Sequence, residues 1–518
     1  MSDETSNCSN YLLRGNAYAA SEKMMTKKNN TQLDPDTIYE TLKSKYDLFS
    51  DPSGMPFATI KDKNNETVPT LDIKFIRSVT RNIHNQTNRP PLSNLVKSYI
   101  TLLEDDALNG PIKKVWLRYA YEENIIYVDT ADENGNIIKI TAGGPTVIPK
   151  QECPVPFYKT KRTRSLPMPD FEGSIEEILP FFHLENQHNI VLFLSCMLKA
   201  MIPIGATPLV SINGPQNTGK TIKSRLTKDL IDPTSPLTTG TPNSERQLFI
   251  SAINSYCLAY DNLSSLNRTL SDLYCTLVTG AGYCTRKLHT DTDEIIFDGK
   301  RFLIMNGIPN FLWSPDICQR SVFLETAPIP AEERLPENIL LHKWEKAKPR
   351  ILGGFYKAVS VALRNIEYVN LDSYNRMADF EQWVVAAIDA LPFTQEQYHQ
   401  ACAANREHIN DEAIDADPVA SAVVAMIAQC HQWTGTASQL LYQLSLFTTE
   451  AIKRTHLWPA QPNKLTENLR RMTVFLAERC IKIEFYKSGD RYIKIYSTAP
   501  PTLISQSTPA PVLPTYYE

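Results

Sequence analysis

The stretch TPLVSINGPQNTGKTIKSRL, residues 207–226, decides the fold of this chain. It predicts a short apolar strand at 207–213 and a helix at 222–230, with the loop GPQNTGKT between them. The loop has the GxxxxGK[ST] spacing of a phosphate-binding loop, in the strand–loop–helix setting that such a loop requires. Its glycines let the backbone approach a phosphate, and the N–H groups at the helix amino terminus attract anions. The alternative is a chance match in a turn rich in Gly and Thr.

Every residue of this loop is therefore a candidate nucleotide ligand. Lys220 is expected to reach the β- and γ-phosphates of ATP, and the Thr221 hydroxyl is expected to bind Mg²⁺. ATP and Mg²⁺ are accordingly the predicted cofactors. The predicted nucleotide-binding residues are Gly214, Pro215, Gln216, Asn217, Thr218, Gly219, Lys220 and Thr221.

Polar residues at the ends of two later strands supply further groups that an ATPase needs. The strand predicted at 255–261 ends in Asp261, which we assign to the Mg²⁺ shell. Asn262 follows, where many ATPases carry Glu, and an amide can orient water but is a poor base. The strand at 300–306 ends in Asn306, a candidate sensor of the γ-phosphate. Asp261 and Asn306 can each instead only cap the turn that follows the strand.

Arg320 opens a fourth predicted strand. A lone Arg at this place can project at the nucleotide of a neighbouring subunit as an arginine finger. The alternative is an ion pair with Asp316 of the same chain. Arg334 and Arg350 are the next candidates for the finger. The predicted catalytic residues are Lys220, Asp261, Asn262, Asn306 and Arg320, and the predicted metal ligands are Thr221 and Asp261.

The order of these groups resembles the AAA+ ATPases of the superfamily III helicase type. More narrowly, it is similar to replication-protein ATPases of phages and mobile genetic islands, which are often the helicase half of primase–helicases. The resemblance covers about residues 110–500 and implies a homo-oligomeric ring, expected to be a hexamer. Asn262 departs from the acidic pair of typical helicases. The segments that carry the likeness are AYDNLS at 259–264, TGAGYCTRKLHTD at 279–291, FDGKRFLIMNGI at 297–308, DICQRSVFLE at 316–325, PRILGGFYKAV at 349–359 and MADFEQWV at 377–384.

A polar segment before the sensor strand corresponds to the hairpin that faces the central pore in that family. Here it spans 285–293, and its potential cations are Arg286, Lys287 and His289. Such a hairpin would grip the phosphates of single-stranded DNA without reading bases. The alternative is a solvated loop whose Asp residues cancel the cations.

Residues 413–498 predict a small C-terminal domain. Asp417 is the expected N-cap of its first helix, and Pro462 opens an amphipathic helix later in the domain. A helix, a strand, two helices and a hairpin in this order are typical of a winged helix. The predicted elements lie at 418–430, 433–436, 437–444, 462–479, 481–486 and 491–496.

This domain is the basic part of a slightly acidic chain. Residues 450–500 carry ten Lys or Arg against five Asp or Glu, whereas the net charge of the whole chain is -4. Winged helices present their third helix to the major groove of duplex DNA, and phosphate contacts position it. The predicted DNA contacts are Lys464, Asn468, Arg471 and Lys487. The alternative is a protein-binding module with a solvated basic face.

The predicted fold is α/β, with an AAA+ core built on a parallel sheet and further domains on both sides. Residues 190–212 are apolar, but Lys199 and Pro203 interrupt them, so we expect a core helix and a buried strand rather than a membrane span. The predicted parts are a disordered tail at 1–35, an α/β domain at 36–157, a basic and Pro-rich linker at 158–174, a helical collar with the ATPase core at 175–336, a helical segment at 337–412, the winged helix at 413–498 and a disordered tail at 499–518.

Cysteine usage and the amino terminus disfavour several classes of protein. The 10 Cys include no CxxC pair, and no HExxH motif is present, which argues against a zinc site and a disulfide framework. The first residues are polar and contain no apolar signal segment. We therefore expect a cytoplasmic protein without a membrane partner.

Two functions remain open. The first is an ATP-dependent DNA helicase or translocase in the replication of a phage or mobile genetic element, with single-stranded DNA in the pore and duplex DNA at the winged helix. The second is a nucleotide-dependent DNA-binding switch, or a defence or regulatory NTPase, that does not unwind. Asn262 favours the second, whereas the hairpin, Arg320 and the winged helix favour the first. A primase or another replication protein is a further candidate partner.

Overall fold

The computed structural model describes residues 34–61, 64–263, 266, 268–280, 282–286, 294–297, 299–307, 315–371 and 376–498. The chain divides into two compact units, Met1–Lys114 and Val115–Glu518. The tails predicted at 1–35 and 499–518 lie outside the described residues, apart from 34 and 35.

The described part of the first unit combines an antiparallel sheet with three helices. Phe75, Val79 and Ile83 recur on one face of helix α3 and are fully buried. They form a hydrophobic core with residues of α4 and of the sheet. The elements are α2 (Pro35–Ser44), β1 (Tyr46–Ser50), β2 (Pro56–Ile60), β3 (Glu66–Pro69), α3 (Ile73–Thr87) and α4 (Ser93–Leu108), with the sheet order β1-β2-β3.

A second antiparallel sheet belongs to the second unit, although the sequence placed it in a domain at 36–157. Tyr119, Ile126 and Ile138 of this sheet lie in one buried cluster with residues of helix α10. The predicted boundary after residue 157 is therefore wrong, because the apolar face of the sheet is covered by a helix far along the chain. The elements are β4 (Tyr119–Glu122), β5 (Ile125–Asp129), β6 (Asn136–Thr141), β7 (Gly144–Pro149) and α10 (Glu337–Asn365); β7 was not predicted.

The segment 158–174, predicted to be a linker, is bonded into the second unit. The N–H of Arg164 donates to the carbonyl of Pro233 at 2.9 Å. The N–H of Leu166 donates to the carbonyl of Thr130 at 2.8 Å. The basic segment is therefore hydrogen-bonded to two separate parts of the second unit and is not a free linker.

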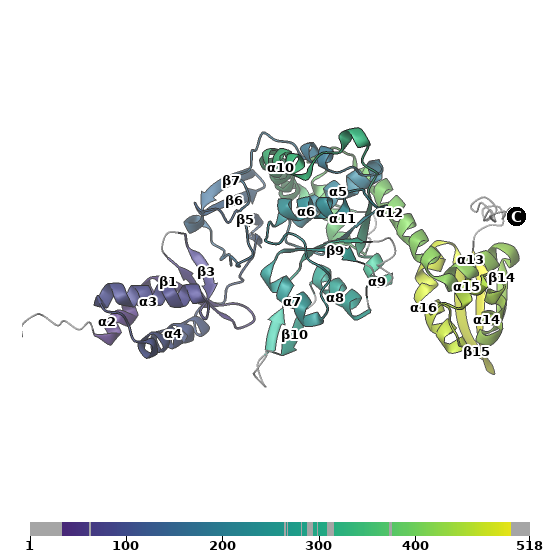
Figure 1. The fold of residues 1–518 in the computed structure, drawn as a ribbon, viewed down its shortest axis with the longest axis horizontal. Coiled ribbons are helices and arrows are strands. Elements are labelled where there is room, and N and C mark those ends of the chain that lie inside the picture. The colour runs from purple at the N-terminus through teal and green to yellow at the C-terminus, as the bar shows by residue number, and fades with distance from the viewer. Residues whose placement is uncertain are drawn as a thin grey trace, which may run out of the picture. The chain divides into compact units, whose positions relative to one another are not determined.

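A parallel sheet of four strands forms the centre of the second unit (Figure 1). All residues of β8 and of β12 are buried. Continuously buried strands are expected in a parallel sheet that is covered on both faces. Beyond β9, an isolated parallel bridge joins Thr239 to Tyr260. The sheet order is β13-β8-β12-β9, with β8 at Leu209–Asn213, β9 at Cys257–Leu263, β12 at Phe302–Gly307 and β13 at Ser321–Glu325.

Helices cover both faces of this sheet. Val210 and Ile304 pack in the cluster that includes α5, α6 and α10, whereas Leu209 and Leu303 pack with α7 and α8. Since successive strand residues point to opposite faces, this alternation sets the two layers. Figure 1 shows α5 and α6 on one side of β9, and α7 and α8 on the other. The bounds are α5 Gln187–Ala200, α6 Lys220–Ile231, α7 Glu245–Asn254 and α8 Arg268–Thr279.

Short elements and the apolar stretch at 190–212 complete the core. That stretch forms the end of α5 and then β8, as predicted. Within the described ranges no helix is by itself long and apolar enough to cross a membrane, although the bent pair α12 and α13 meets the criterion by length and composition. The short elements are η1 (Lys150–Glu152), η2 (Ile175–Phe181), β10 (Tyr283–Arg286), β11 (Glu294–Phe297), α9 (Pro315–Cys318), η3 (Ala331–Glu333), η4 (Ile366–Tyr368), α11 (Ala378–Ala386) and η5 (Ile388–Ala390).

A C-terminal module, residues 417–498, follows helix α12 (Gln395–Ala416). Its elements occur in the predicted order, with the short helix α15 in addition. Asp417 caps the first helix as expected, because its carboxylate accepts hydrogen bonds from the N–H groups of Val419 and Ala420 at 2.9 and 3.0 Å. The elements are α13 (Pro418–Cys430), β14 (Gln432–Thr436), α14 (Ala437–Ser445), α15 (Glu450–Lys453), α16 (Pro462–Glu478), β15 (Ile481–Ser488) and β16 (Asp490–Ser497), with the sheet order β14-β16-β15.

Candidate nucleotide site and nucleic-acid surfaces

The candidate phosphate loop connects β8 to α6 at the carboxyl edge of the parallel sheet. Gly214 (φ 134°) and Gly219 (φ 74°) adopt backbone conformations that favour glycine. A Cβ atom on Gly214 would clash with Thr326, which follows β13. The Thr326 hydroxyl donates to the carbonyl of Asn213 and bonds the hydroxyl of Thr218, both at 2.8 Å. Thr326 thus fixes the loop, and the sequence missed it because no local pattern connects it to the loop.

Lys220 bends back over the loop that precedes it. Its Nζ donates hydrogen bonds to the carbonyl oxygens of Gly214 at 2.7 Å and of Pro215 at 2.6 Å. Burial lowers the pKa of the Lys220 ammonium, and the charge of Glu325 opposes this shift. The ammonium therefore lies against the loop, where it can exchange carbonyl oxygens for phosphate oxygens.

The two predicted metal ligands meet in the structure. Thr221 lies in the first turn of α6, and Asp261 lies in β9. The distance from Thr221 Oγ1 to Asp261 Oδ1 is 3.0 Å, although β12 separates the strands β8 and β9. Mg²⁺ prefers oxygen ligands and is usually held by one or two carboxylates together with substrate phosphates. The pair is therefore chemically suited to hold a magnesium ion beside the loop.

Asn306 links three elements at the same edge of the sheet. The pairing of β12 with β9 shifts its register here, so that Asp261 and Asn262 oppose Asn306. Its Oδ1 accepts a hydrogen bond from the N–H of Asn262 at 3.0 Å, and its Nδ2 donates to Ser224 Oγ at 2.7 Å. The buried amide thus positions β9 and α6 relative to β12. The alternative partner, the turn at 307–309, falls mostly outside the described residues.

Asn262 presents its side chain to solvent beside Asp261. Its φ of 59° lies in the left-handed region, which Asn tolerates better than most residues. The residue after the candidate metal ligand is therefore an exposed amide, which can orient a water molecule but cannot act as a strong base.

Arg320 lies at the amino-terminal end of the parallel strands, whereas the phosphate loop lies at their carboxyl-terminal end. The next residue, Ser321, pairs with Leu209 at the start of β8, whereas the loop follows the end of β8. A strand of this length rises about 16 Å, so Arg320 cannot reach the loop of its own subunit. Its guanidinium pairs with Asp316, as the alternative interpretation expected. Arg376 pairs with the same carboxylate.

The two other candidate fingers are also engaged within the chain. Arg350 pairs with Asp170 and with Glu177, each at 2.9 Å. Arg334 donates from Nε to the carbonyl of Ile329 at 3.1 Å. Both side chains therefore have partners within the chain, as Arg320 does.

Strands β10 and β11 form an antiparallel ladder at the two ends of the segment that is predicted to face a pore. The last pair before the loop joins Arg286 to Glu294. The loop at 287–293 lies outside the described residues, and with it lie Lys287 and His289. The position of these two cations therefore stays a prediction.

Three of the four predicted duplex contacts are exposed on the C-terminal module. Lys464 and Arg471 lie on α16, and Lys487 lies near the tip of the hairpin that β15 and β16 form. Asn468 does not face solvent as expected, since it is 7% exposed and its Nδ2 donates to Asp417 Oδ2 at 2.6 Å. Because Asp417 also caps α13, Asn468 joins two helices instead of offering a DNA contact.

A buried ion cluster lies at the far end of α6 from the loop. Asp232 accepts hydrogen bonds from Arg118 Nε at 3.2 Å and from Lys228 Nζ at 3.4 Å. It also accepts from the N–H groups of Tyr256 at 2.9 Å and of Cys257 at 3.1 Å. Burial alone would raise the pKa of Asp232, but the charges of Lys228 and Arg118 hold it below its ordinary value. The cluster connects the sheet β4–β7, helix α6 and strand β9.

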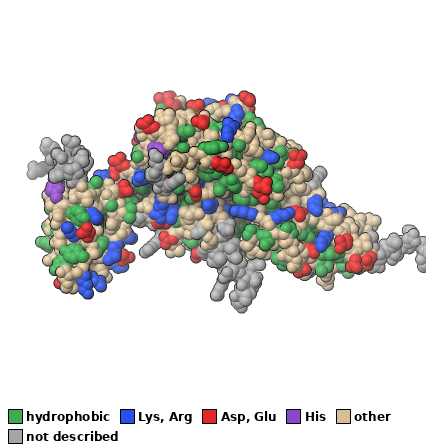
Figure 2. All heavy atoms as spheres, turned by 180° about the vertical axis from the view of Figure 1, so that it is seen from behind, with side chains coloured by type: hydrophobic (Ala, Val, Ile, Leu, Met, Phe, Trp, Pro, Cys, Tyr) green, Lys and Arg blue, Asp and Glu red, His purple; other side chains and the backbone are tan. Residues whose placement is uncertain are grey.

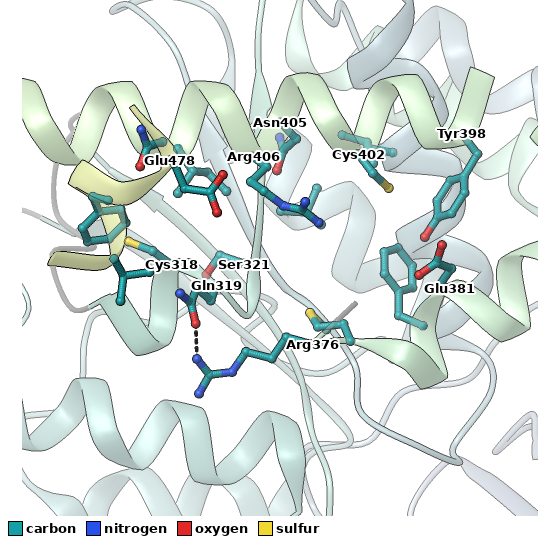
Figure 3. A pocket seen from close by; sticks show the side chains of 18 residues that line it. Cys318, Gln319, Ser321, Arg376, Glu381, Tyr398, Cys402, Asn405, Arg406 and Glu478 are labelled. Carbon is teal, nitrogen blue, oxygen red and sulfur yellow. Dashed lines mark hydrogen bonds between the residues drawn. The ribbon is translucent and has the colours of Figure 1, made fainter. Parts of the chain in front are cut away.

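A cavity of about 400 Å³ lies at the edge of the sheet where Arg320 is found, away from the phosphate loop. Its lining comes from the turn before β13, from α11 and α12, and from α16. Figure 3 shows Arg376 directed at Gln319, and Arg406 and Glu478 on separate helices above it. The residues that line it include none from the candidate nucleotide site.

Two family models match adjoining parts of the chain. Residues 175–412 match the model described as "Actinomycete integrative conjugative element replication protein". Residues 419–509 match the model of the RepA C-terminal domain of such elements. A search of curated proteins found no match.

Solved structures show a distant likeness. The apo structure of the C-terminal region of NrS-1 (its residues 305–718) is 12% identical, with 90% of this chain and 99% of that chain covered and a TM-score of 0.37. The A form apo structure of the same region is also 12% identical, with 90% and 100% covered and a TM-score of 0.38.

Proposed function

We propose that this chain, a replication protein of the actinomycete integrative conjugative element type, is an ATP-driven motor that acts on DNA. The family matches support the role in replication of a mobile element. The ATPase activity, the ring and the DNA contacts are inferences from the geometry of the described residues.

The contact between Thr221 and Asp261 carries the proposal. In P-loop ATPases, the Ser or Thr of the loop and an acidic residue on a nearby strand hold the same Mg²⁺. Here these two residues meet at 3.0 Å, although the strand that bears Asp261 is not the neighbour of β8. A chance match of the loop motif gives no reason for a carboxylate at this position. The contact therefore supports a nucleotide site.

The residues of the chain divide the work of such a site. Lys220 and the backbone N–H groups of the loop would hold the phosphates of ATP. Thr221 and Asp261 would hold Mg²⁺, which when bound neutralises phosphate charge. Asn306 holds the backbone of Asn262, so it would position the amide that orients the attacking water.

Arg320 supports an oligomer in which each nucleotide is shared between subunits. Because it lies at the amino edge of the sheet, it can approach only the nucleotide of a neighbour. Its partner Asp316 would have to release it, while Arg376 remains to pair with that carboxylate. A closed ring, expected to be a hexamer from the resemblance, satisfies this arrangement at every interface.

The C-terminal module supports contact with duplex DNA. Its order of α13, β14, α14, α16 and a hairpin is that of a winged helix, which presents its third helix to the major groove. Lys464 and Arg471 on α16, and Lys487 on the hairpin, would contact phosphates.

Asn262 favours a second candidate function, a nucleotide-dependent switch that binds DNA without unwinding it. An exposed amide beside Asp261 suits slow hydrolysis, because it cannot act as a strong base. Slow turnover is sufficient for a switch and insufficient for a processive motor.

Strand displacement on a forked DNA, measured with and without ATP, tests the motor. We expect displacement that needs ATP, and hydrolysis that single-stranded DNA stimulates. Lys220→Ala should reduce both activities at least about a hundredfold, because it removes the cation expected to bind the γ-phosphate in the transition state.

Lys346→Ala is the matched control, since it removes one exposed positive charge from α10 and should leave both activities unchanged. Circular dichroism checks that each variant is folded. Hydrolysis without displacement would favour the switch, and full hydrolysis by Lys220→Ala would reject the nucleotide site.

A further inference from the structure

The outer face of the C-terminal sheet carries three tyrosines. Strands β15 and β16 pair Tyr486 with Tyr492, and alternate residues of a strand point to opposite faces. Ile483 and Ile495 are buried in the core on the other face. Tyr486, Tyr492 and Tyr496 therefore share the face turned away from the helices, which we call the tyrosine face.

Two of these rings form an exposed stack. The centroids of Tyr486 and Tyr492 lie 5.7 Å apart, with the ring planes 18° from parallel. Tyr486 is 44% exposed, so the stack is open to solvent. Neither ring is part of the hydrophobic core of the module. The packing of the core therefore gives no reason for aromatic residues at this position.

Two lysines share the face of the stack. The alternation of the strands places Lys482 and Lys494 on the tyrosine face together with Glu484 and Asp490. Lys494 Nζ lies 4.9 Å from the centre of the Tyr496 ring. Glu484 accepts a hydrogen bond from the Tyr496 hydroxyl at 2.8 Å and lies 3.8 Å from Lys482 Nζ. That carboxylate is thus engaged by two partners on its own face, and Lys482 and Lys494 are the cations that the face offers to a phosphate.

Lys and Arg side chains also gather at the lower end of the module in Figure 2, where the hairpin of β15 and β16 ends (Figure 1). Lys487 and Arg491 face each other across the two strands at this tip. Because successive residues alternate faces, these two side chains leave the hairpin on the side opposite Tyr486 and Tyr492, so they lie at the end of the tyrosine face and not on it.

We propose that the tyrosine face binds single-stranded DNA, with unpaired bases stacked on Tyr486 and Tyr492 and phosphates near Lys482 and Lys494. Stacking on exposed aromatic rings tolerates any base, and a positive groove follows the backbone. Duplex DNA hides the faces of its bases within the helical stack, so an aromatic platform selects unpaired strands. The inference deepens the proposed function, since it assigns a second form of DNA to a module proposed to bind duplex by α16.

An oligothymidylate that carries one 2-aminopurine tests the platform with the full chain, because the fluorescence of this base reports stacking directly. We expect binding to change that fluorescence. Tyr486→Ala and Tyr492→Ala should each weaken binding of the oligonucleotide at least about fivefold. The corresponding Phe variants should retain binding, since the ring is kept.

Tyr442→Ala is the matched control, because Tyr442 is 70% exposed on α14, away from this face. The pair Lys464→Ala and Arg471→Ala should weaken duplex binding and leave the fluorescence change intact. This outcome separates the two surfaces. If the unmutated protein stacks the oligonucleotide base but does not bind duplex DNA, only the proposed role of α16 is rejected. The tyrosine face is rejected if the folded double Ala variant binds the oligonucleotide normally, or if the Phe variants lose as much as the Ala variants.

Discussion

At the scale of single residues, Lys199 shows how strongly burial acts in this core. Its Nζ has no exposure and donates to the carbonyl oxygens of Ile202 at 3.1 Å and of Ile204 at 2.5 Å. Burial lowers the pKa of Lys199 to about 7, and the charge of Asp379 opposes the shift. The charged form is thus kept at a cost, next to the strand that leads into the phosphate loop.

Lys199→Met should change how stability depends on pH. The unfolded chain holds this proton up to about pH 10.5, whereas the folded protein releases it near pH 7. The unfolded state therefore binds more protons between these values, and the free energy of unfolding rises with pH there by up to about 1.4 kcal/mol per unit. The variant should lose this rise in urea unfolding at pH 7 and pH 9. An unchanged slope, with Lys346→Met as the exposed control, would contradict the prediction.

The residue scale also shows the reach of sequence analysis. Motif spacing and a strand end each identify one member of the pair Thr221 and Asp261, and the two side chains are in contact in the structure. Thr326 was not found, since it acts on the loop only through tertiary contact. Asn468 was placed on a DNA face because helix periodicity shows which residues share a side but not which distant carboxylate covers that side.

At the scale of elements, local patterns located helices and strands better than domain boundaries. The hairpin of β15 and β16 and helix α16 follow directly from apolar periodicity. The sequence groups the sheet β4–β7 with the N-terminal domain, whereas it packs in the second unit, because its attachment depends on residues distant in the sequence. Arg118 bonds Asp232, and the Tyr119 hydroxyl donates to the carbonyl of Ile231 at 3.1 Å. No local sequence pattern predicts contacts between residues so far apart in the chain.

Arg118→Met should test how much the buried cluster stabilises the junction of these elements. Removal of one member leaves Asp232 buried with less compensation, which costs about 3–5 kcal/mol for a buried ion pair. Urea unfolding measures this loss. Arg454→Met, which removes an exposed Arg of the C-terminal module, should cost less than about 0.5 kcal/mol. A cost for Arg118→Met as small as that of the control would show that the cluster adds no stability.

At the scale of the whole molecule, the proposed role of Arg320 predicts that ATP hydrolysis depends on assembly. Lys220→Ala and Arg320→Ala should each be inactive alone, because one lacks the loop cation and the other the proposed finger. In an equimolar mixture, about one quarter of the interfaces of a cyclic oligomer combine an intact loop with an intact finger. Mixed subunits should therefore regain roughly that share of ATPase activity.

Arg454→Ala is the control for this mixing experiment, because it removes one exposed Arg of the C-terminal module. It should remain active without any partner. Full activity of Arg320→Ala by itself would place the finger elsewhere, and inactive mixtures would show that the two groups serve the same subunit.

Strand β13 would couple each nucleotide site of such an assembly to the neighbouring subunit on one side only. Thr326, at one end, is bonded to the subunit's own phosphate loop, and Arg320, at the other end, is the proposed finger for the next subunit. A shift of the loop on nucleotide binding would push on a strand that is buried over most of its length and cannot bend easily. The effect of nucleotide binding at one site would then be transmitted to only one of the two neighbouring subunits. The subunits of a ring would then hydrolyse ATP sequentially and not independently of one another.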